Sequence, residues 1–381
     1  MATTAQQQQQ QQQRQQLRQQ CTTIVPGFSS LSPAEEFKAL AAWCEARQDA
    51  GEPIADVYGE GGLLARFEQQ IATLLGKPAA VFMPSGVMAQ LVAVRLHTEA
   101  ARLPRFGLSP NSHLALHEQE AAQSLWGLHG VPIGSRLRPL LASDLAAVRQ
   151  PLACALVELP MREIGGQLPS WDELQALQAQ AQSLGIALHM DGARLWQCRP
   201  HFQQRSYAEI SAGFSSVYVS MYKDIGGLAG ALLAGQADFT ANARLWQRRL
   251  GGNLYQQTPL VASAMMRFEQ RLTLLDACHA RTLDLARGLA ALDGMRVNPA
   301  TPQVNMLHLH LDAPADALNR ARDMLAEREK CWLFGTARPT EVPGWSSLEL
   351  SVGDHLLALD NAAVLPLFER LLAQARKPSS G

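Results

Sequence analysis

Short apolar runs alternate with amphipathic segments along much of the chain, from about residue 60 to residue 260. Between residues 64 and 75, large apolar side chains recur every three or four positions, which predicts a helix that ends at Gly76. Buried strands separated by amphipathic helices are typical of an α/β fold whose mostly parallel sheet is covered on both faces. Uninterrupted apolar runs predict such strands at residues 79–83, 153–159, 186–190, 216–220 and 228–233.

The pattern changes in the last third of the chain. Residues 304–311 and 347–352 alternate apolar and polar side chains, which predicts strands with one exposed face. We therefore predict a large domain over residues 21–265 and a smaller C-terminal α+β domain over residues 266–381. Helical spacing places helices of the small domain at residues 315–330 and 359–376.

The N-terminal segment differs from both regions, because residues 5–20 are nearly all glutamine. A polar tract of this kind cannot bury enough surface to offset the entropy lost on ordering. We therefore predict that residues 1–20 form a disordered or frayed helical tail, and we base no functional inference on them. Phe37, Leu40 and Trp43 then predict an amphipathic helix that precedes the alternating pattern.

Composition narrows the classes of partner. The net charge of −1 gives no overall field that would favour a nucleic acid or an anionic membrane, so we expect neither as a partner. The six cysteines lack the spacing of a zinc or redox motif, which indicates buried thiols in a reducing compartment and no metal site. No apolar run approaches the ~20 residues that cross a bilayer, and the N-terminus lacks the apolar core of a secretory signal. We expect a cytoplasmic protein that acts on a small polar metabolite.

Polar residues that could carry chemistry follow three predicted strands, at the edge where open α/β sheets bind ligands. The first group is Ser85, Gly86 and Val87, at a turn from strand to helix. A glycine lets the backbone approach a ligand closely, and a helix N-terminus offers free N–H groups to a phosphate. By itself the same turn is an ordinary helix start.

Asp191 and Lys223 each follow one of the other two strands. Asp191 precedes Gly192 and Arg194, which fits a local ion pair or helix cap, or an anion that keeps a ring nitrogen protonated. Lysines are usually solvated. A lysine held at a ligand-binding edge can instead have a lowered pKa and attack a carbonyl carbon. The order and spacing of the three groups favour the functional interpretation.

In that order and spacing the chain resembles the fold-type-I pyridoxal-phosphate (PLP) enzymes, and most closely the threonine aldolase and β-eliminating lyase family. The similarity runs from Asp56 to about Gly252. Its motifs are DVYGE at residues 56–60, FMPSGVMA at 82–89, Ser112 and His113 followed by Glu118, Gly165 and Gly166, LHMDGARL at 188–195, and the Lys223 strand.

The resemblance implies pyridoxal 5'-phosphate as the cofactor, bonded covalently to the amine of Lys223. It implies that Asp191 pairs with the pyridine nitrogen, so that the ring accepts electrons from the substrate. It implies that His113 stacks on the ring and takes a proton from the substrate hydroxyl. Ser85, Gly86 and the backbone of Val87 would surround the phosphate.

The resemblance also implies the substrate class and the assembly. Arg194 would bind the carboxylate of an amino acid, and Tyr58 would lie beside the substrate. A β-hydroxy-α-amino acid bound in this way would be cleaved between Cα and Cβ, giving glycine and an aldehyde. The family further implies a homodimer or homotetramer with active sites at subunit interfaces.

Several positions depart from the family pattern. Val87 stands where the family has threonine, Tyr255 where many members have a phosphate-binding arginine, and Glu349 where a carboxylate-binding arginine is expected. Arg338 or Arg162 could then assist Arg194 with the substrate carboxylate. These departures keep two alternatives open: β-elimination or transamination of another amino acid on the same cofactor, and a non-catalytic protein of the same fold.

Overall fold

The computed structural model describes residues 4–377, which fall into two compact units. One unit comprises residues 30–273, and the other comprises the residues up to Ser29 together with those from Leu274 onward. This division differs from the predicted one at two points. The predicted boundary after residue 265 falls inside helix α11, Thr258–Arg271, and residues 21–29 belong with the C-terminal unit.

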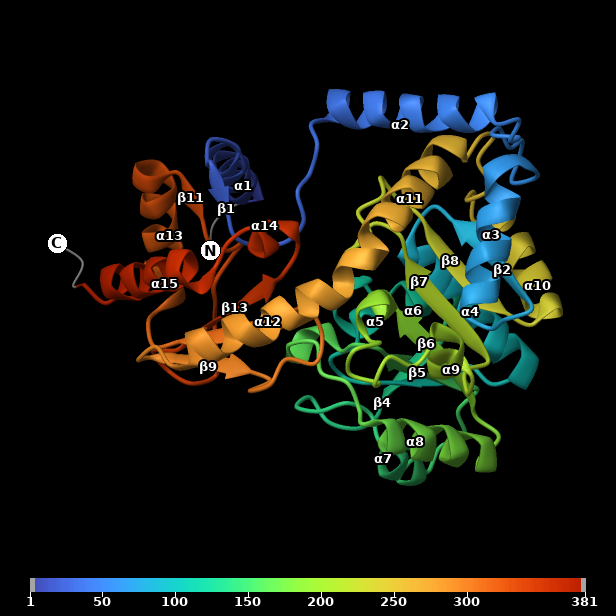
Figure 1. Ribbon diagram of the computed structural model, residues 1–381. Helices are drawn as coiled ribbons and strands as arrows, with labels where there is room; N and C mark the ends of the chain where they lie inside the picture. The colour runs from blue at the N-terminus through green and yellow to red at the C-terminus, as the bar shows by residue number, and fades with distance from the viewer. Residues whose placement is uncertain (1–3, 378–381) are drawn as a thin grey trace. The chain divides into compact units, whose positions relative to one another are not determined.

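The unit of residues 30–273 is built on a seven-stranded sheet in the order β2-β8-β7-β6-β5-β3-β4 (Figure 1). β8 runs antiparallel to its two neighbours, and the remaining strands are parallel to one another. Every residue of β7 and β8 is buried, which requires that both faces of the sheet are covered. The strands are β2 Ala79–Met83, β3 Arg105–Leu108, β4 His129–Pro132, β5 Cys154–Glu158, β6 Ala187–Gly192, β7 Ser216–Ser220 and β8 Ala231–Gly235. The predicted α/β class with a mostly parallel sheet is confirmed.

Helix α4, Gly86–Ala101, packs across the middle of this sheet, against β2, β3 and β5 to β8. It begins at Ser85, whose side-chain oxygen accepts a hydrogen bond from the N–H of Met88 at 3.2 Å. The other helical segments are α2 Pro33–Asp49, α3 Gly62–Leu74, α5 His113–His117, α6 Ala121–Trp126, α7 Ala142–Ala146, η1 Arg162–Ile164, α8 Trp171–Ser183, η2 Leu195–Gln197, α9 Tyr207–Ser211, α10 Ala237–Arg249 and α11, followed by η3 Leu272–Leu274.

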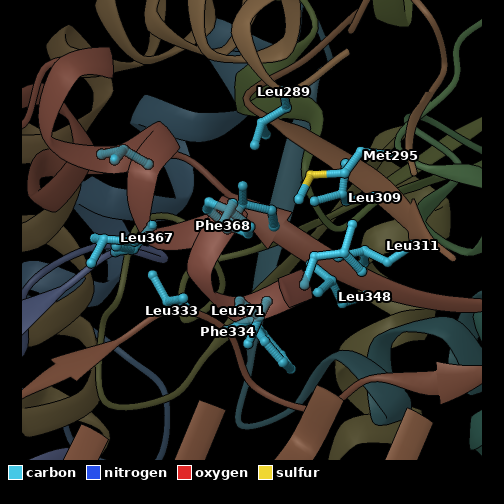
Figure 2. Packing of buried hydrophobic residues seen from close by; sticks show 14 of the residues in the cluster. Leu289, Met295, Leu309, Leu311, Leu333, Phe334, Leu348, Leu367, Phe368 and Leu371 are labelled. Atoms are coloured by element: carbon cyan, nitrogen blue, oxygen red, sulfur yellow. The ribbon is translucent and has the colours of Figure 1, made fainter. Parts of the chain in front are cut away.

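The second unit has a four-stranded antiparallel sheet in the order β12-β13-β10-β9 and a short parallel pair of β1 with β11. Its core gathers the apolar side chains of β10 and β13 with those of the helices beside them, among them Leu309, Leu348 and Phe368 (Figure 2). The predicted α+β character of this region is confirmed. Its elements are β1 Thr23–Ile24, α12 Leu275–Ala290, β9 Met295–Asn298, β10 Met306–Leu311, α13 Ala315–Glu329, β11 Cys331–Trp332, β12 Arg338–Pro339, β13 Ser346–Ser351, α14 Asp354–Leu357 and α15 Asn361–Ala375.

The glutamine tract is helical over its described part, which agrees with the helical one of the two predicted forms and not with a disordered tail. Helix α1 spans Thr4–Gln19 and packs against α13 of the same unit. Glutamine has a helix propensity close to those of lysine and glutamate, so contact with a neighbouring helix suffices to order such a tract. None of the helices in the described part of the chain is long and apolar enough to cross a membrane.

Candidate active site

The predicted site residues of the larger unit, with the exception of Tyr58, gather at one edge of the seven-stranded sheet. β2, β3, β5, β6 and β7 are parallel, so their carboxyl ends lie on the same side. Glu158, Asp191 and Tyr218 are neighbours in register on adjacent strands, so their side chains lie on one face of the sheet. Lys223 follows β7, and His113 follows β3 after a loop of four residues, 109–112.

Lys223 is partly buried beside Tyr222, with its Nζ 5.6 Å from the centroid of that ring. Burial and the positive charge of Arg194 lower the pKa of Lys223, while the carboxylate of Asp191 opposes the shift. A lower pKa increases the fraction of neutral amine at neutral pH, and only the neutral amine attacks a carbonyl carbon.

Asp191 is 4% exposed, and both of its carboxyl oxygens accept hydrogen bonds. Oδ1 accepts from the N–H of Ala193 at 3.1 Å, and Oδ2 accepts from the side-chain amide of Gln90. Burial raises the pKa of Asp191, against the charges of His113, Lys223 and Arg194, which lower it. A further positive charge beside this carboxylate, such as a protonated ring nitrogen, would favour its ionised form.

The N-terminus of α4 presents backbone N–H groups that an anion could accept from. The N–H groups of Gly86 and Val87 lie in the first turn, where an α-helix supplies no acceptor of its own. Gly86 is required there, because a Cβ atom would overlap the hydroxyl of Tyr218 and lie 2.9 Å from that of Tyr222. The loss of the family threonine at Val87 removes a hydroxyl but leaves these backbone donors in place.

His113 begins helix α5 and is held by two carboxylates. Its Nδ1 lies 3.0 Å from Oε1 of Glu118, and its backbone N–H donates to Oε2 of Glu158 at 3.2 Å. Burial raises the pKa of Glu118. His117 lies one turn further along the same helix, with its ring centroid 5.2 Å from that of His113.

Glu158 is a site residue that the sequence patterns did not identify. Burial and the negative charge of Asp191 raise the pKa of Glu158 to about 7. Its two oxygens accept from the backbone N–H groups of His113 and Arg162, so it ties the His113 loop to the end of β5. The signal was present: an acidic residue ends an apolar strand here, as Asp191 does in the neighbouring strand.

Arg194 lies close enough to act on the site electrostatically. Its charge lowers the pKa values of Asp191 and Glu158, although it is not their principal influence. The described residues offer its guanidinium no hydrogen bond or ion pair. Arg162, the predicted substitute, contacts Glu163 at 2.9 Å.

Tyr58 is 54% exposed, and the structure joins it to a different part of the unit. Its N–H donates to the carbonyl of Tyr255 at 2.9 Å, and the two rings meet edge to face at 5.2 Å. Asp56 fixes this loop through hydrogen bonds to the backbone N–H groups of Gln257 and Thr258. Within residues 4–377, no hydrogen bond links Tyr58 to Lys223.

Glu349 and Arg338 belong to the other compact unit. Glu349 lies in β13, directly opposite His308 of β10, and Arg338 begins the edge strand β12. Their predicted roles toward a substrate carboxylate remain predictions.

A chain of buried hydrogen bonds continues behind Asp191. The Oε1 atom of Gln90 lies 2.7 Å from Nε2 of His189, and Nδ1 of His189 lies 2.7 Å from the hydroxyl of Ser216. That hydroxyl lies 2.7 Å from Nε2 of His97. Burial lowers the pKa of His97 to about 4 and that of His189 to about 3, so both imidazoles are neutral at neutral pH.

The low pKa of His97 predicts a specific dependence of stability on pH. Between pH 6.5 and about 4 the unfolded chain binds a proton at this position and the folded chain does not, so acid lowers the free energy of unfolding of the wild type. His97→Phe keeps the stacking on Phe239 but removes this linkage. Denaturant unfolding measures how much lower the free energy of unfolding of His97→Phe is than that of the wild type. This deficit should be about 2 kcal/mol smaller at pH 5 than at pH 8.

His129→Phe provides the control, because His129 is exposed in the folded chain. The deficit of His129→Phe should therefore stay constant over the same pH range. A constant deficit for His97→Phe as well would contradict the burial of a neutral imidazole at position 97.

Comparisons with known proteins agree with this geometry. A family model described as β-eliminating lyase matches residues 41–312. Low-specificity L-threonine aldolase 1 of Arabidopsis thaliana is 28% identical, covering 89% of this chain and 93% of its own. A solved structure from Listeria monocytogenes EGD-E, assigned as an L-allo-threonine aldolase, is 34% identical with a TM-score of 0.86, covering 94% of this chain and 98% of its own. A second solved structure, from Exiguobacterium sp. 255-15, is assigned as an aromatic amino acid β-eliminating lyase/threonine aldolase. It is 35% identical with a TM-score of 0.86, covering 94% of this chain and 99% of its own.

The fold and the family match therefore place the chain in the class that the sequence predicted, the fold-type-I pyridoxal-phosphate enzymes. Within that class the chain belongs to the β-eliminating lyase family, and it is a lyase of the threonine aldolase type.

Proposed function

We propose that this protein binds PLP through Lys223 and cleaves the Cα–Cβ bond of β-hydroxy-α-amino acids, giving glycine and an aldehyde. One observation carries the proposal. A partly buried lysine with a lowered pKa and a buried carboxylate lie within electrostatic reach of each other, at a sheet edge that also presents a helix N-terminus. An amine, a carboxylate and a set of free N–H groups are the three partners that an aldehyde-bearing, phosphorylated pyridine requires.

Each of these groups has a separate task. Lys223 supplies the neutral amine, Asp191 supplies the negative charge opposite the ring nitrogen, and the first turn of α4 supplies N–H donors to the phosphate. PLP, when bound, supplies an electron-accepting ring that stabilises negative charge at the substrate Cα. Asp191 maintains this capacity, because a protonated ring nitrogen accepts electrons better than a neutral one.

We propose that His113 is the base that removes the proton from the substrate β-hydroxyl. When Glu118 is ionised, its carboxylate accepts a hydrogen bond from Nδ1–H of His113. A neutral His113 then has a free lone pair on Nε2. Glu158 fixes the backbone of the same residue. This arrangement, in which a carboxylate orients a histidine base, is effective because it selects one tautomer.

The substrate carboxylate is assigned to Arg194, which the described residues leave without a salt bridge. With Glu349 where the family places an arginine, one charge-assisted contact is missing. Such a loss costs about 1.5–3 kcal/mol, or roughly one to two decades in affinity. We therefore expect a high Michaelis constant for threonine.

Activity on a panel of substrates tests the proposed function. Purified protein supplied with PLP should release aldehyde from at least one of threonine, allo-threonine and phenylserine, and should show the absorption of bound cofactor before substrate is added. Absence of aldehyde from all three, with the cofactor bound, would contradict the proposed substrate class.

His113→Phe should retain PLP but lose most of the retro-aldol activity. Phenylalanine keeps the stacking surface and removes proton transfer, which is worth roughly 10²–10⁴ in rate. The measurement is kcat for aldehyde release beside the PLP content of the same sample. His117→Phe is the matched control on the same helix. If the two variants keep equal activity, His113 is not the base.

We further propose that the protein is cytoplasmic and forms a homodimer or homotetramer. Val57, Tyr58 and Tyr255 are each more than half exposed, and they lie on two loops that hydrogen bonds join. Apolar and aromatic side chains gathered on exposed loops suit an interface between identical subunits. A fully active monomer in sedimentation at assay concentration would contradict this assembly.

A further inference from the structure

We propose that Gln90, His189, Ser216 and His97 form a hydrogen-bond relay whose donors all point toward Asp191. In this relay the four residues are positioning residues that keep Asp191 ionised and directed at the cofactor ring. The role toward the ring rests on the proposed function; the direction of the relay does not.

The relay is assembled by the packing of α4 on the sheet. Gln90 and His97 are seven residues apart on α4, which is two helical turns, so they face the same side. His189 and Asp191 are two apart on β6 and share a face of the sheet. Ser216 of β7 is the register partner of His189. All five side chains are at most 8% exposed, so water does not compete for their hydrogen bonds.

The direction of each hydrogen bond follows from the carboxylate at one end. An ionised carboxylate only accepts, so the amide that contacts Asp191 must be the N–H₂ group of Gln90. The oxygen of Gln90 must then accept from Nε2–H of His189. A neutral imidazole has one N–H, which leaves Nδ1 of His189 as an acceptor.

The same reasoning fixes the far half of the relay. Ser216 must donate its only O–H to Nδ1 of His189. Its oxygen is then an acceptor for Nε2–H of His97. One protonation pattern therefore satisfies four consecutive hydrogen bonds, and reversing any one of them would place two donors or two acceptors face to face.

The relay acts on the charge of Asp191. Burial favours the neutral acid, as the raised pKa of Asp191 shows. A row of dipoles aligned toward the carboxylate opposes this by stabilising the negative form, and aligned hydrogen bonds polarise one another. The relay also occupies Oδ2 while Ala193 occupies Oδ1, and these two hydrogen bonds fix the orientation of the carboxylate.

The histidine tautomers provide the first test, and it requires no catalysis. In the full-length protein labelled with ¹⁵N-histidine, without and with added PLP, His189 and His97 should both be neutral Nε2–H tautomers at pH 7. The signal of His97 is identified by its loss in His97→Phe. A Nδ1–H tautomer at either position would overturn the relay.

The effect on the cofactor provides the second test. Gln90→Met keeps the length of the side chain but removes the donor to Asp191. The dissociation constant for PLP should rise roughly tenfold, and the pH midpoint of the absorption of bound PLP should move up by about one unit, as expected for the loss of one charge-assisted hydrogen bond. Ser216→Ala breaks the relay two positions further away and should shift both values in the same direction by less.

Ser211→Ala is the matched control, because Ser211 is also fully buried and its hydroxyl has no partner in the described part of the chain. It should leave both values unchanged. If Gln90→Met and Ser216→Ala behave like Ser211→Ala, the relay does not act on Asp191. If the protein shows the predicted tautomers but binds no PLP, the direction of the relay is confirmed. Its role toward the ring is then overturned, and the proposed function is contradicted.

Discussion

Lys223→Ala is expected to abolish aldehyde release, with a fall in kcat of at least roughly 10³-fold, because no other group at this edge of the sheet replaces its amine. The fold should persist, since Lys223 is partly exposed and follows β7 outside the regular hydrogen bonds of the sheet. Borohydride reduction of the wild type followed by peptide mapping should place the cofactor on Lys223. The variant should carry no reducible label, although PLP can still bind through its phosphate and ring.

Lys77 is an informative control for this assignment. Burial lowers its pKa too, but its Nζ donates to the backbone carbonyl oxygens of Ser211 and Phe214 rather than facing Asp191. If a lowered pKa alone determined labelling, Lys77 would compete for the cofactor. A label on Lys77, or on any lysine other than Lys223, would contradict the assignment.

Asp191→Asn is expected to reduce kcat by roughly 10²–10³-fold, the usual consequence of removing one buried electrostatic partner from an active site. The substitution conserves the shape of the side chain, but it leaves one acceptor oxygen for two donors, the amide of Gln90 and the N–H of Ala193, so one of these hydrogen bonds is lost. The neutral amide no longer stabilises a protonated ring nitrogen. Rate, cofactor content and circular dichroism measured on the same preparation separate this effect from loss of fold or of PLP.

A wild-type rate in Asp191→Asn would show that the ring nitrogen does not require this carboxylate. The same result would also remove the functional role of the relay behind it, although the hydrogen bonds themselves would remain. The variant therefore tests the chemical assignment of Asp191 independently of Lys223.

Sequence patterns predicted the sheet well where strands are continuous apolar runs. β5 and β7 are examples, since burial on both faces requires apolar residues at every position. β3 and β4 escaped prediction, because each has four residues and a glycine, which gives too short a run to distinguish from a loop. β3 depends on pairing with β5, and β4 depends on pairing with β3; such long-range pairing has no local signal.

The site was predictable to the extent that its residues follow strands. Asp191, Lys223 and the turn at Gly86 were identified in this way, and the structure brings them to one edge. Gln90 was not, because it lies inside a helix and the same side chain on a helix surface would be solvated. Its significance depends on burial against β6, which only the tertiary structure reveals.

Assignment of residues to domains was the weakest part of the prediction. Residues 21–29 were placed with the large domain by their position in the chain, yet Thr23 and Ile24 pair with Cys331 and Trp332 of the C-terminal unit. A strand of two residues carries no periodicity from which this could be inferred.

Product stoichiometry tests the central claim most directly. When a single β-hydroxy amino acid such as phenylserine is consumed by the wild-type protein, cleavage between Cα and Cβ predicts one glycine and one aldehyde per substrate, no ammonia, and none of these products with Lys223→Ala. Release of ammonia with an oxo acid, and without glycine, would instead demonstrate β-elimination and contradict the proposed reaction.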